Sequence, residues 1–260
     1  KMQKITIKKI LKKKNKIPIT CLSLYSKTMA EIADKYCDII LVGDSLGMVL
    51  LGMKTTKDVN IETMILHGKT VKKNVKRSLV VVDMPYRTYT NKLIAYSNAK
   101  KVIKLTKCDA IKLEGGKKIV KIIKHLVNKG IPVMGHIGLL PQFSTKFKLQ
   151  GKNFSQKKTI FEDAKAVTNA GVFAIVVECV VESLAKKITK HVSVPTIGIG
   201  ASKYCDGQIL VADDMLGLTN FVPRFVKKYS NLKSIADKCM KNYTKEVRSR
   251  RFPSSKNVYS

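Results

Sequence analysis

The sequence predicts an α/β protein that folds as a (βα)8 barrel, the TIM-barrel architecture, with a helix ahead of the first strand. The first observation is a gap in the lysines. In a chain with 50 Lys and Arg residues, the ten-residue blocks beginning at 41, 81, 131, 171, 191 and 211 contain no Lys. The second is that short apolar runs alternate with segments of helical periodicity. About eight such units fit a chain of 260 residues, which favours a closed barrel over an open sheet.

The candidate strands are short runs rich in β-branched residues, and most of them end at a polar residue or a glycine. Continuous apolar runs of this length are typical of parallel strands that are buried on both faces. In chain order, the predicted strands are Ile17–Leu22, Asp38–Asp44, Ser78–Asp83, Ala110–Glu114, Ile131–His136, Val172–Glu178, Pro195–Gly200 and Gly207–Val211.

The segments between the strands have the apolar spacing of amphipathic helices. Ser26 and Asn60 are residue types that cap helix N-termini, so helices are expected to begin there. In the first helix, Met29, Ile32, Ala33 and Tyr36 share one apolar face. The predicted helices are Ser26–Tyr36, Asn60–Lys76, Asn91–Thr106, Lys117–Asn128, Lys157–Asn169 and Val181–His191.

The two ends of the chain are expected to lie outside the barrel. Residues 1–16 contain a basic amphipathic segment, Ile5–Asn15, which predicts the N-terminal helix, and residues 246–260 read as a loosely held C-terminal tail. No shift in composition marks a second domain, so residues 1–260 are expected to form a single domain. No run approaches the roughly 18 apolar residues of a membrane span, and residues 1–20 lack the apolar stretch of a secretion signal.

The net charge of +32 first suggests nucleic acid as a partner. However, only six of the 50 basic residues are Arg, and the Lys residues are scattered without interleaved aromatic residues. This distribution favours solvated helix faces, so neither a nucleic acid nor a membrane is expected as a partner. The six Cys residues form no CxxC pair and no Cys/His cluster with zinc spacing, which favours a reducing, cytoplasmic location.

The scarce acidic residues indicate where the chemistry lies. Asp44, Asp83, Glu114 and Glu178 each end a predicted strand, and in a βα barrel these ends meet at one rim, where active sites are found. Carboxylates gathered there repel one another unless a cation lies among them, and Mg²⁺ is the usual hard cation for such oxygen ligands. The alternative is that these acids merely cap the helices that follow.

Lys112 is the exception among the strand residues, because it is basic. It lies two residues before Glu114, so both side chains point to the same face of the strand. A Lys inside a barrel requires a carboxylate or an anionic ligand, because an unpaired buried ammonium is costly. It is either a structural ion pair with Glu114 or a cation for a substrate carboxylate or enolate. His136 is either a hydrogen-bond donor of the site or a satisfied core histidine.

Five ordered motifs extend this pattern: Leu41–Gly52 (LVGDSLGMVLLG), Val80–Tyr86 (VVVDMPY), Ile111–Gly116 (IKLEGG), Val133–Gln142 (VMGHIGLLPQ) and Ile197–Gly217 (IGIGASKYCDGQILVADDMLG). Together they resemble the ketopantoate hydroxymethyltransferase (3-methyl-2-oxobutanoate hydroxymethyltransferase) family, over about residues 3–250. The sequence departs from the family pattern at Leu140, where Thr is usual, and at Ser202, where Gly is usual.

The resemblance implies an enzyme of pantothenate biosynthesis. It would transfer a hydroxymethyl group from 5,10-methylenetetrahydrofolate to 3-methyl-2-oxobutanoate, giving 2-dehydropantoate through a Mg²⁺-stabilised enolate. It also implies a (βα)8 barrel that assembles as a homodecamer. The alternative is another Mg²⁺-dependent lyase or mutase of the phosphoenolpyruvate mutase/isocitrate lyase type, which forms an enolate from a 2-oxo acid.

The resemblance also implies roles for individual residues. Asp44, Asp83 and Glu114 match the metal-site carboxylates, and Glu178 matches the catalytic base. Asp44, Asp83, Ser45 and Lys112 match substrate-binding positions, and His136 is the further candidate for substrate binding.

Overall fold

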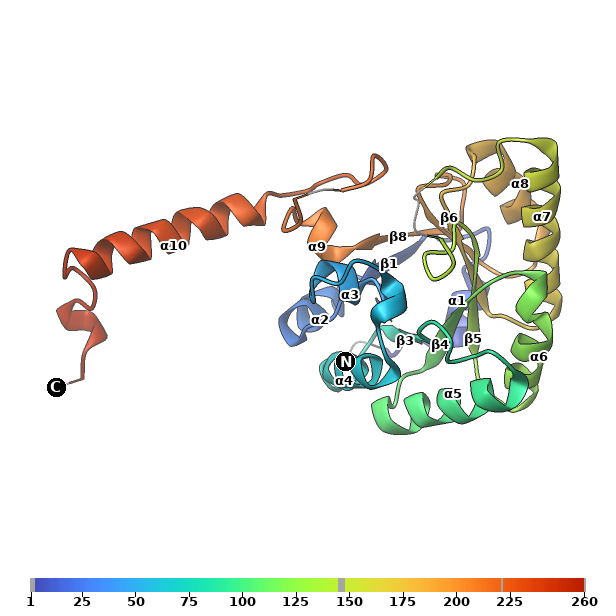
Figure 1. The fold of residues 1–260 in the computed structure, drawn as a ribbon, viewed down its shortest axis with the longest axis horizontal. Coiled ribbons are helices and arrows are strands. Elements are labelled where there is room, and N and C mark those ends of the chain that lie inside the picture. Colours follow the sequence, from blue (N-terminus) through green and yellow to red (C-terminus); the bar gives the residue numbers. More distant parts are fainter. Residues whose placement is uncertain (1–2, 145–147, 221, 260) are drawn as a thin grey trace. The chain divides into compact units, whose positions relative to one another are not determined.

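The computed structural model describes residues 3–144, 148–220 and 222–259, and its central feature is a closed barrel of eight parallel strands (Figure 1). Each strand pairs with the next along the chain, and β8 pairs with β1 to close the barrel. The strands are β1 (Ile19–Ser23), β2 (Ile39–Val42), β3 (Leu79–Asp83), β4 (Ala110–Glu114), β5 (Val133–Gly138), β6 (Ala174–Glu178), β7 (Thr196–Ile199) and β8 (Gly207–Val211). The predicted (βα)8 fold is therefore confirmed, with strand ends shifted by one or two residues.

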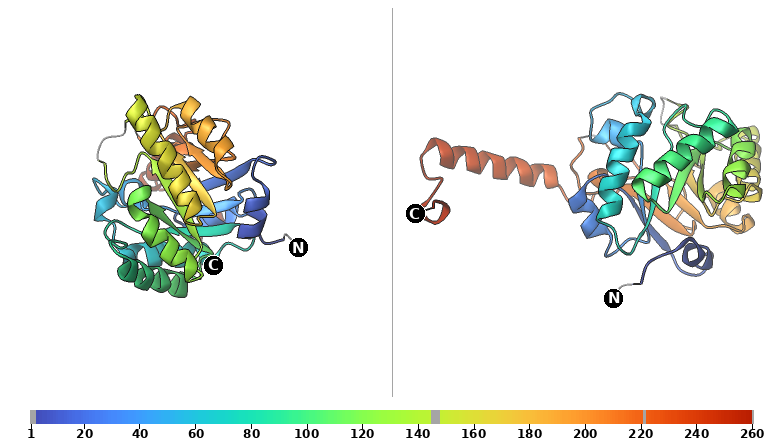
Figure 2. Two further views of the ribbon diagram at one scale, coloured as in Figure 1. Left: turned by 90° about the vertical axis from the view of Figure 1, so that its right-hand side faces the viewer. Right: turned by 90° about the horizontal axis from the view of Figure 1, so that it is seen from below.

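Helices alternate with the strands, and α4 to α8 lie side by side around the outside of the barrel (Figure 2). Ser26 and Asn60 are the N-caps of α2 and α4, as predicted. The helices of this part of the chain are α1 (Ile7–Lys12), α2 (Lys27–Ala33), α3 (Leu46–Val49), α4 (Ile61–Lys73), α5 (Lys92–Thr106), α6 (Val120–Asn128), α7 (Phe154–Asn169) and α8 (Glu182–His191), with the 3₁₀ turns η1 (Thr56–Asp58) and η2 (Lys117–Ile119).

The predicted apolar face of the first helix is only partly confirmed, because Met29 and Ala33 pack against the core but Ile32 and Tyr36 do not. The helix α2 ends at Ala33 and buries Ala30 and Ala33, whereas Ile32 is exposed and Tyr36 is 71% exposed. The contact of α2 with the core is made by Ala30 and Ala33, with Met29 partly buried beside them, whereas Ile32 and Tyr36 remain at the surface.

The predicted helix before the barrel is present as α1, and it closes one end of the barrel interior. Ile5 and Ile10 pack in the same apolar cluster as inward-facing strand residues such as Ile19. Ion pairs hold the segment in place: Lys13 Nζ lies 2.6 Å from Asp38 Oδ1, and Lys14 Nζ lies 2.8 Å from Asp206 Oδ2. These contacts leave the other end of the barrel, where the strands end, for the site.

The chain divides into two compact units, Lys1–Ala212 and Asp213–Ser260. The second unit contains the 3₁₀ turn η3 (Ser255–Asn257) and α10 (Leu232–Arg248), a helix of 17 residues in which no residue is buried. The short helix α9 (Ala212–Met215) begins at the boundary. Residues 246–260 were predicted to be a tail, but α10 continues to Arg248; residue 260, like residues 1–2, lies outside the described part. The single-domain organisation stays a prediction.

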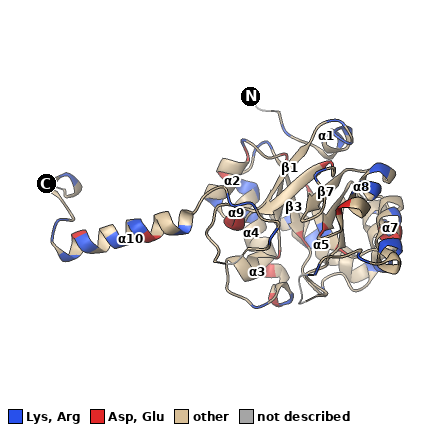
Figure 3. Ribbon diagram, turned by 90° about the horizontal axis from the view of Figure 1, so that it is seen from above, with Lys and Arg blue, Asp and Glu red and all other residues tan. Residues whose placement is uncertain are grey.

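Lys and Arg residues lie mainly on helices and in loops, and the barrel strands contain almost none of them (Figure 3). Among the described strands, only β4 contains a Lys or Arg residue, which is Lys112. No helix among the described residues is both long and apolar enough to cross a membrane. The distribution explains the Lys-free blocks of the sequence, because strand side chains face either the barrel interior or the covering helices.

Candidate active site

The barrel register brings the predicted site residues together at the carboxyl ends of the strands. Asp83 and Lys112 are paired residues of β3 and β4, and Glu114 and His136 are paired residues of β4 and β5. Glu178 is the last residue of β6. All five are less than 9% exposed, although each has a polar or ionisable side chain. A buried group of this kind must be satisfied by its own members or by a ligand.

Lys112 is the centre of this group. Its Nζ lies 3.0 Å from Asp83 Oδ1, 3.7 Å from Glu114 Oε1 and 3.2 Å from His136 Nδ1. Burial alone lowers the pKa of Lys112, but the surrounding carboxylates outweigh burial and raise it. Lys112 is therefore a permanently charged group, and it joins two carboxylates rather than Glu114 alone.

His136 connects the Lys112 group to Glu178. Its Nδ1 lies 3.4 Å from Glu114 Oε1, and its Nε2 lies 3.1 Å from Glu178 Oε2. Burial and Lys112 lower the pKa of His136, whereas Glu114 and Glu178 raise it, with a net value of about 9. The Nε2 atom is buried and, despite this distance, has no partner with hydrogen-bond geometry. His136 is thus an ionisable member of the cluster rather than a satisfied core histidine.

Asp44 and Ser45 follow β2, in the turn that leads to α3. The backbone N–H of Asp44 donates to Asp83 Oδ2 at 3.1 Å, and Ser45 Oγ lies 2.7 Å from the hydroxyl of Tyr25. Gly43 permits this packing: a Cβ there would lie 2.7 Å from Ser23 Oγ and 3.1 Å from Ser45 Oγ. Asp44 lies two residues beyond the end of β2 at Val42, so it was wrongly predicted to be a strand residue, although it lies on the predicted rim.

The four acids do not cap helices, which was the alternative explanation for their positions. Ser45 is the N-cap residue of α3, Asn91 caps α5 and Val181 precedes α8. Gly116 occupies the corresponding position before η2. The acids instead face Lys112, His136 and one another.

The cluster contains more carboxyl groups than basic side chains. An added cation would therefore reduce the repulsion among the carboxylates. Burial raises the pKa of Asp44, and Asp83 and Glu114 raise it further. Burial also raises the pKa of Asp83, against the lowering effect of Lys112. The buried Oδ1 of Asp83 has no hydrogen-bond partner, although Lys112 lies within ion-pair distance. These carboxylates therefore retain capacity for a further positive group.

The residues fit a hard divalent cation in their donor chemistry. Within the described ranges, no three His, Cys, Asp or Glu side chains are gathered closely enough to form a metal site by themselves. Mg²⁺, however, is commonly held by one or two carboxylates, with water and substrate oxygens as the other ligands. Asp44 and Asp83, joined through the Asp44 N–H, are suitable ligands of that kind.

Two further residues of this group, Gln142 and Tyr89, were not predicted from the sequence. Gln142 lies in the loop after β5, is 1% exposed, and donates a hydrogen bond to Asp44. It ends the VMGHIGLLPQ motif, which was the only signal available for it. Tyr89 follows β3 and donates a hydrogen bond to Gln142.

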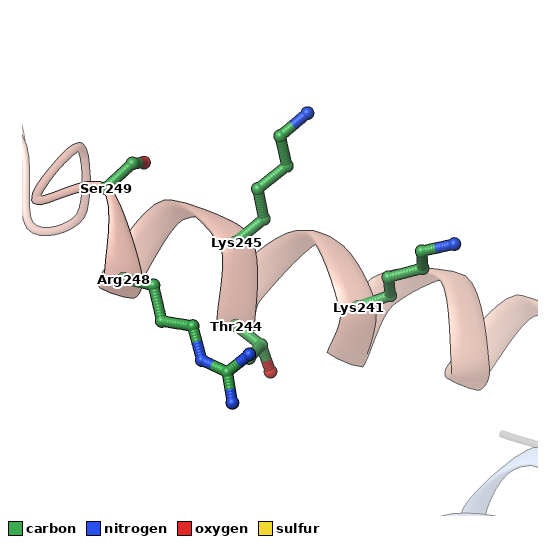
Figure 4. A pocket seen from close by; sticks show the side chains of 5 residues that line it. All are labelled: Lys241, Thr244, Lys245, Arg248 and Ser249. Carbon is green, nitrogen blue, oxygen red and sulfur yellow. The ribbon is translucent and has the colours of Figure 1, made fainter.

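A shallow depression elsewhere offers no comparable chemistry. It is formed on α10 and its C-terminal end, and holds none of the predicted site residues (Figure 4). Its lining residues are all exposed, as expected for a solvated basic helix face. They are Lys241, Thr244, Lys245, Arg248 and Ser249.

Solved structures with a similar fold include a phosphonopyruvate hydrolase crystallised with oxalate and Mg²⁺. It is 10% identical, with a TM-score of 0.64 over 98% of this chain and 92% of that chain. A 2,3-dimethylmalate lyase of the phosphoenolpyruvate mutase/isocitrate lyase superfamily has a TM-score of 0.62 at 12% identity, over 94% of this chain and 97% of that chain. Identities this low show a shared barrel fold.

Sequence comparison is more specific. The profile of the ketopantoate hydroxymethyltransferase family matches residues 4–255. The 3-methyl-2-oxobutanoate hydroxymethyltransferase of Pelagibacter ubique is 56% identical over 97% of this chain and 99% of its own length. The enzyme of the same name from Bartonella henselae is 49% identical over 99% of this chain and 95% of its own length. The chain therefore belongs to the ketopantoate hydroxymethyltransferase family.

Proposed function

We propose that this chain is a transferase that moves a hydroxymethyl group from 5,10-methylenetetrahydrofolate to 3-methyl-2-oxobutanoate, giving 2-dehydropantoate for pantothenate synthesis. Membership of the family carries the proposal. The buried series of contacts from Asp83 through Lys112 and His136 to Glu178 supports it, because it links a buried ammonium group to a carboxylate that is able to accept a proton. The reaction also consumes one water, which supplies the hydroxyl oxygen.

The family suggests a divalent metal, and Mg²⁺ is the proposed ion, with Asp44 and Asp83 as its ligands and Glu114 as a further carboxylate of the metal site. When bound, such an ion acts as a Lewis acid that polarises the keto group of a 2-oxo acid and so acidifies the neighbouring C–H. The raised pKa values of the Asp44 and Asp83 carboxyl groups support this assignment, because an added cation would offset the repulsion among these acids.

The chain's own residues then divide the remaining tasks. Glu178 accepts the proton from C3 of 3-methyl-2-oxobutanoate. The Lys112 ammonium, held by Asp83 and Glu114, lies where negative charge develops as the enolate forms, and stabilises it electrostatically. His136, 3.1 Å from Glu178, orients that carboxylate and contributes to binding the substrate. Ser45 binds the substrate beside Asp44. The enolate carbon then bonds to the methylene carbon, and water supplies its hydroxyl group. Both bonds from that carbon to the folate nitrogens break, and the nitrogens take up the proton removed from C3 and one from the water, so that tetrahydrofolate leaves.

The alternative reaction, that of a phosphoenolpyruvate mutase or isocitrate lyase relative, is not favoured. Solved structures of that type share the barrel at 10–12% identity, whereas the relatives at 46–56% identity are hydroxymethyltransferases by name. The sequence also lacks the KKCGH-type loop that would supply the catalytic Cys of a lyase. A cytoplasmic location stays a prediction.

Self-association is also proposed, and the family resemblance implies a homodecamer. The exposed apolar side chains of α10 support association, because an amphipathic helix with no buried residue is expected to gain a partner surface. They include Ile235, Met240, Tyr243 and Val247. Light scattering with size-exclusion chromatography would measure the assembly, and a monodisperse monomer at micromolar concentration would contradict this proposal.

The test of the reaction is an assay for 2-dehydropantoate from 3-methyl-2-oxobutanoate and methylenetetrahydrofolate, before and after chelation. Wild-type protein should form product, lose activity with a chelator, and recover it when Mg²⁺ is restored. Asp83→Ala should lose the metal-dependent activity, whereas Asp58→Ala, at an exposed position, should keep it. Absence of product from the wild-type protein would contradict the proposed reaction, and full activity under chelator would contradict the metal.

A further inference from the structure

Gln142 joins three strand ends of the site, although it belongs to a loop and is not among the residues assigned above. Its side-chain Nε2 donates to Asp44 Oδ2 at 2.7 Å and to the Met84 carbonyl oxygen at 2.9 Å. Its backbone N–H donates to Glu114 Oε2 at 3.0 Å. One residue therefore provides hydrogen bonds to a carboxylate that follows β2, to the backbone after β3 and to the last residue of β4.

Tyr89 acts together with Asp44 and Met84 to fix which way the Gln142 amide faces. The Tyr89 hydroxyl donates to Gln142 Oε1, on the side of the amide away from Asp44. A flipped amide would place Oε1 against two acceptors, the Asp44 carboxylate and the Met84 carbonyl oxygen, and would leave the Tyr89 hydroxyl only the Glu114 carbonyl oxygen, at 3.4 Å, to donate to. Tyr89 is 4% exposed, so no water competes freely for this hydrogen bond. The two side chains thus form a single unit with one stable orientation.

This unit opposes the repulsion among the acids. Asp44 and Glu114 are both buried, and each raises the electrostatic cost of ionising the other carboxyl groups of the cluster. Hydrogen bonds to an ionised carboxylate are among the stronger ones in proteins. By donating to both carboxylates, Gln142 fixes the orientation of one carboxylate relative to the other.

We propose that Gln142, oriented by Tyr89, is a positioning residue that presents the Asp44 and Glu114 carboxylates to the divalent cation of the site. The consequence for the cation rests on the proposed function, whereas the hydrogen bonds do not. Partners that orient metal ligands typically change metal affinity by about 10- to 100-fold when they are removed. Loss of either member of the Gln142–Tyr89 unit should therefore weaken the cation without removing any ligand.

The experiment measures Mn²⁺ affinity in the full-length protein by electron paramagnetic resonance of the free ion. Gln142→Met keeps the size of the side chain and the backbone N–H to Glu114 but removes the amide donors. Tyr89→Phe removes one hydroxyl. Both variants should bind Mn²⁺ about 10-fold more weakly or worse. The control is Tyr96→Phe, a half-buried tyrosine of α5 that packs against His125, which should bind like wild type.

The double variant separates this positioning role from two independent losses. If Tyr89 acts through Gln142, adding Tyr89→Phe to Gln142→Met should weaken binding little further, because interacting residues are not additive. Tyr89→Phe is the milder change, and it decides the question if Gln142→Met does not fold. Unchanged Mn²⁺ affinity in a folded Tyr89→Phe protein would overturn the proposal while leaving the proposed reaction intact. A wild-type protein that binds no Mn²⁺ would overturn both.

Discussion

Lys112 Nζ lies 3.0 Å from Asp83 Oδ1, and the two residues are paired across β3 and β4 in the barrel register. Both side chains are less than 6% exposed. The pair is therefore shielded from water, and each charge lowers the free-energy cost of burying the other. The Asp83–Lys112 ion pair therefore contributes both to the stability of the barrel and to the proposed chemistry.

Replacing Lys112 by Met should destabilise the protein as well as inactivate it. Asp83 and Glu114 would lose their buried cation, and removing one partner of a buried pair typically costs about 3–5 kcal/mol. Urea unfolding would measure the loss. Lys117→Met is the control, because Lys117 pairs with Glu162 at 3.6 Å with its side chain 60% exposed, and it should change stability by less than about 1 kcal/mol. Equal effects of the two substitutions would contradict the importance of the buried pair.

Glu178→Gln should leave substrate and metal binding intact but abolish proton transfer. The amide keeps the shape of the side chain and cannot accept the C3 proton, so exchange of that hydrogen in D2O should slow by at least about 100-fold. Proton NMR of 3-methyl-2-oxobutanoate would measure the rate. Glu182→Gln, at an exposed position in the first turn of α8, should exchange normally. A normal rate in Glu178→Gln would exclude Glu178 as the base.

Gly138→Ala tests how closely the site strands must approach. A Cβ at Gly138 would lie 2.4 Å from the carbonyl oxygen of Glu178, and its φ of 91° disfavours any L side chain. Gly130 has a similar φ of 77° but nothing within 4 Å of the added atom. Gly138→Ala should therefore cost about 1–3 kcal/mol more than Gly130→Ala in unfolding free energy and should slow C3–H exchange. Identical losses would show that only backbone strain matters.

Asp34→Asn should lower stability in a pH-dependent way. Asp34 Oδ1 accepts the Ser78 N–H at 2.7 Å, and Oδ2 accepts the Lys76 N–H at 2.8 Å. Burial raises the pKa of Asp34, but these donors outweigh it and lower the pKa. A lowered pKa means that the stabilisation is present above the unfolded value of about 3.9 and is lost as pH falls through the folded value.

The stability difference between wild type and Asp34→Asn should therefore be about 1–3 kcal/mol at pH 7 and should shrink below about pH 4. Urea unfolding at both pH values would measure it, with Asp58→Asn at an exposed position as the control. A difference that grows on acidification would show that the sign of the pKa shift is wrong.

Much of the fold could be predicted because the buried segments of this chain contain almost no Lys, whereas Lys is frequent elsewhere. Lys is abundant wherever water reaches the chain, so its absence marked the strands, and strand alternation placed Lys112 on the same side as Glu114. The acids at strand ends could be placed at one rim because parallel strands in a barrel all end on the same side.

The exposure of individual helix residues could not be predicted, because it depends on which side of each helix packs against the rest of the protein. Ile32 and Tyr36 have helical spacing, yet both are exposed, because the side of α2 that meets the core carries Met29, Ala30 and Ala33 and the helix ends before Tyr36. The helix α10 was also missed. It buries no residue, so it lacks the buried apolar face by which the helices around the barrel were recognised.

The sequence by itself determined the strand order, the family and the residue types of the site. Tertiary structure alone decided that His136 contacts Glu178 and that Gln142 and Tyr89 join the carboxylates. Tyr89 and Gln142 are 53 positions apart in loops with no periodicity, and the pairing of β3 with β4 and of β4 with β5 brings those loops together. Local patterns record what is buried, whereas contacts between loops depend on the geometry of the whole barrel.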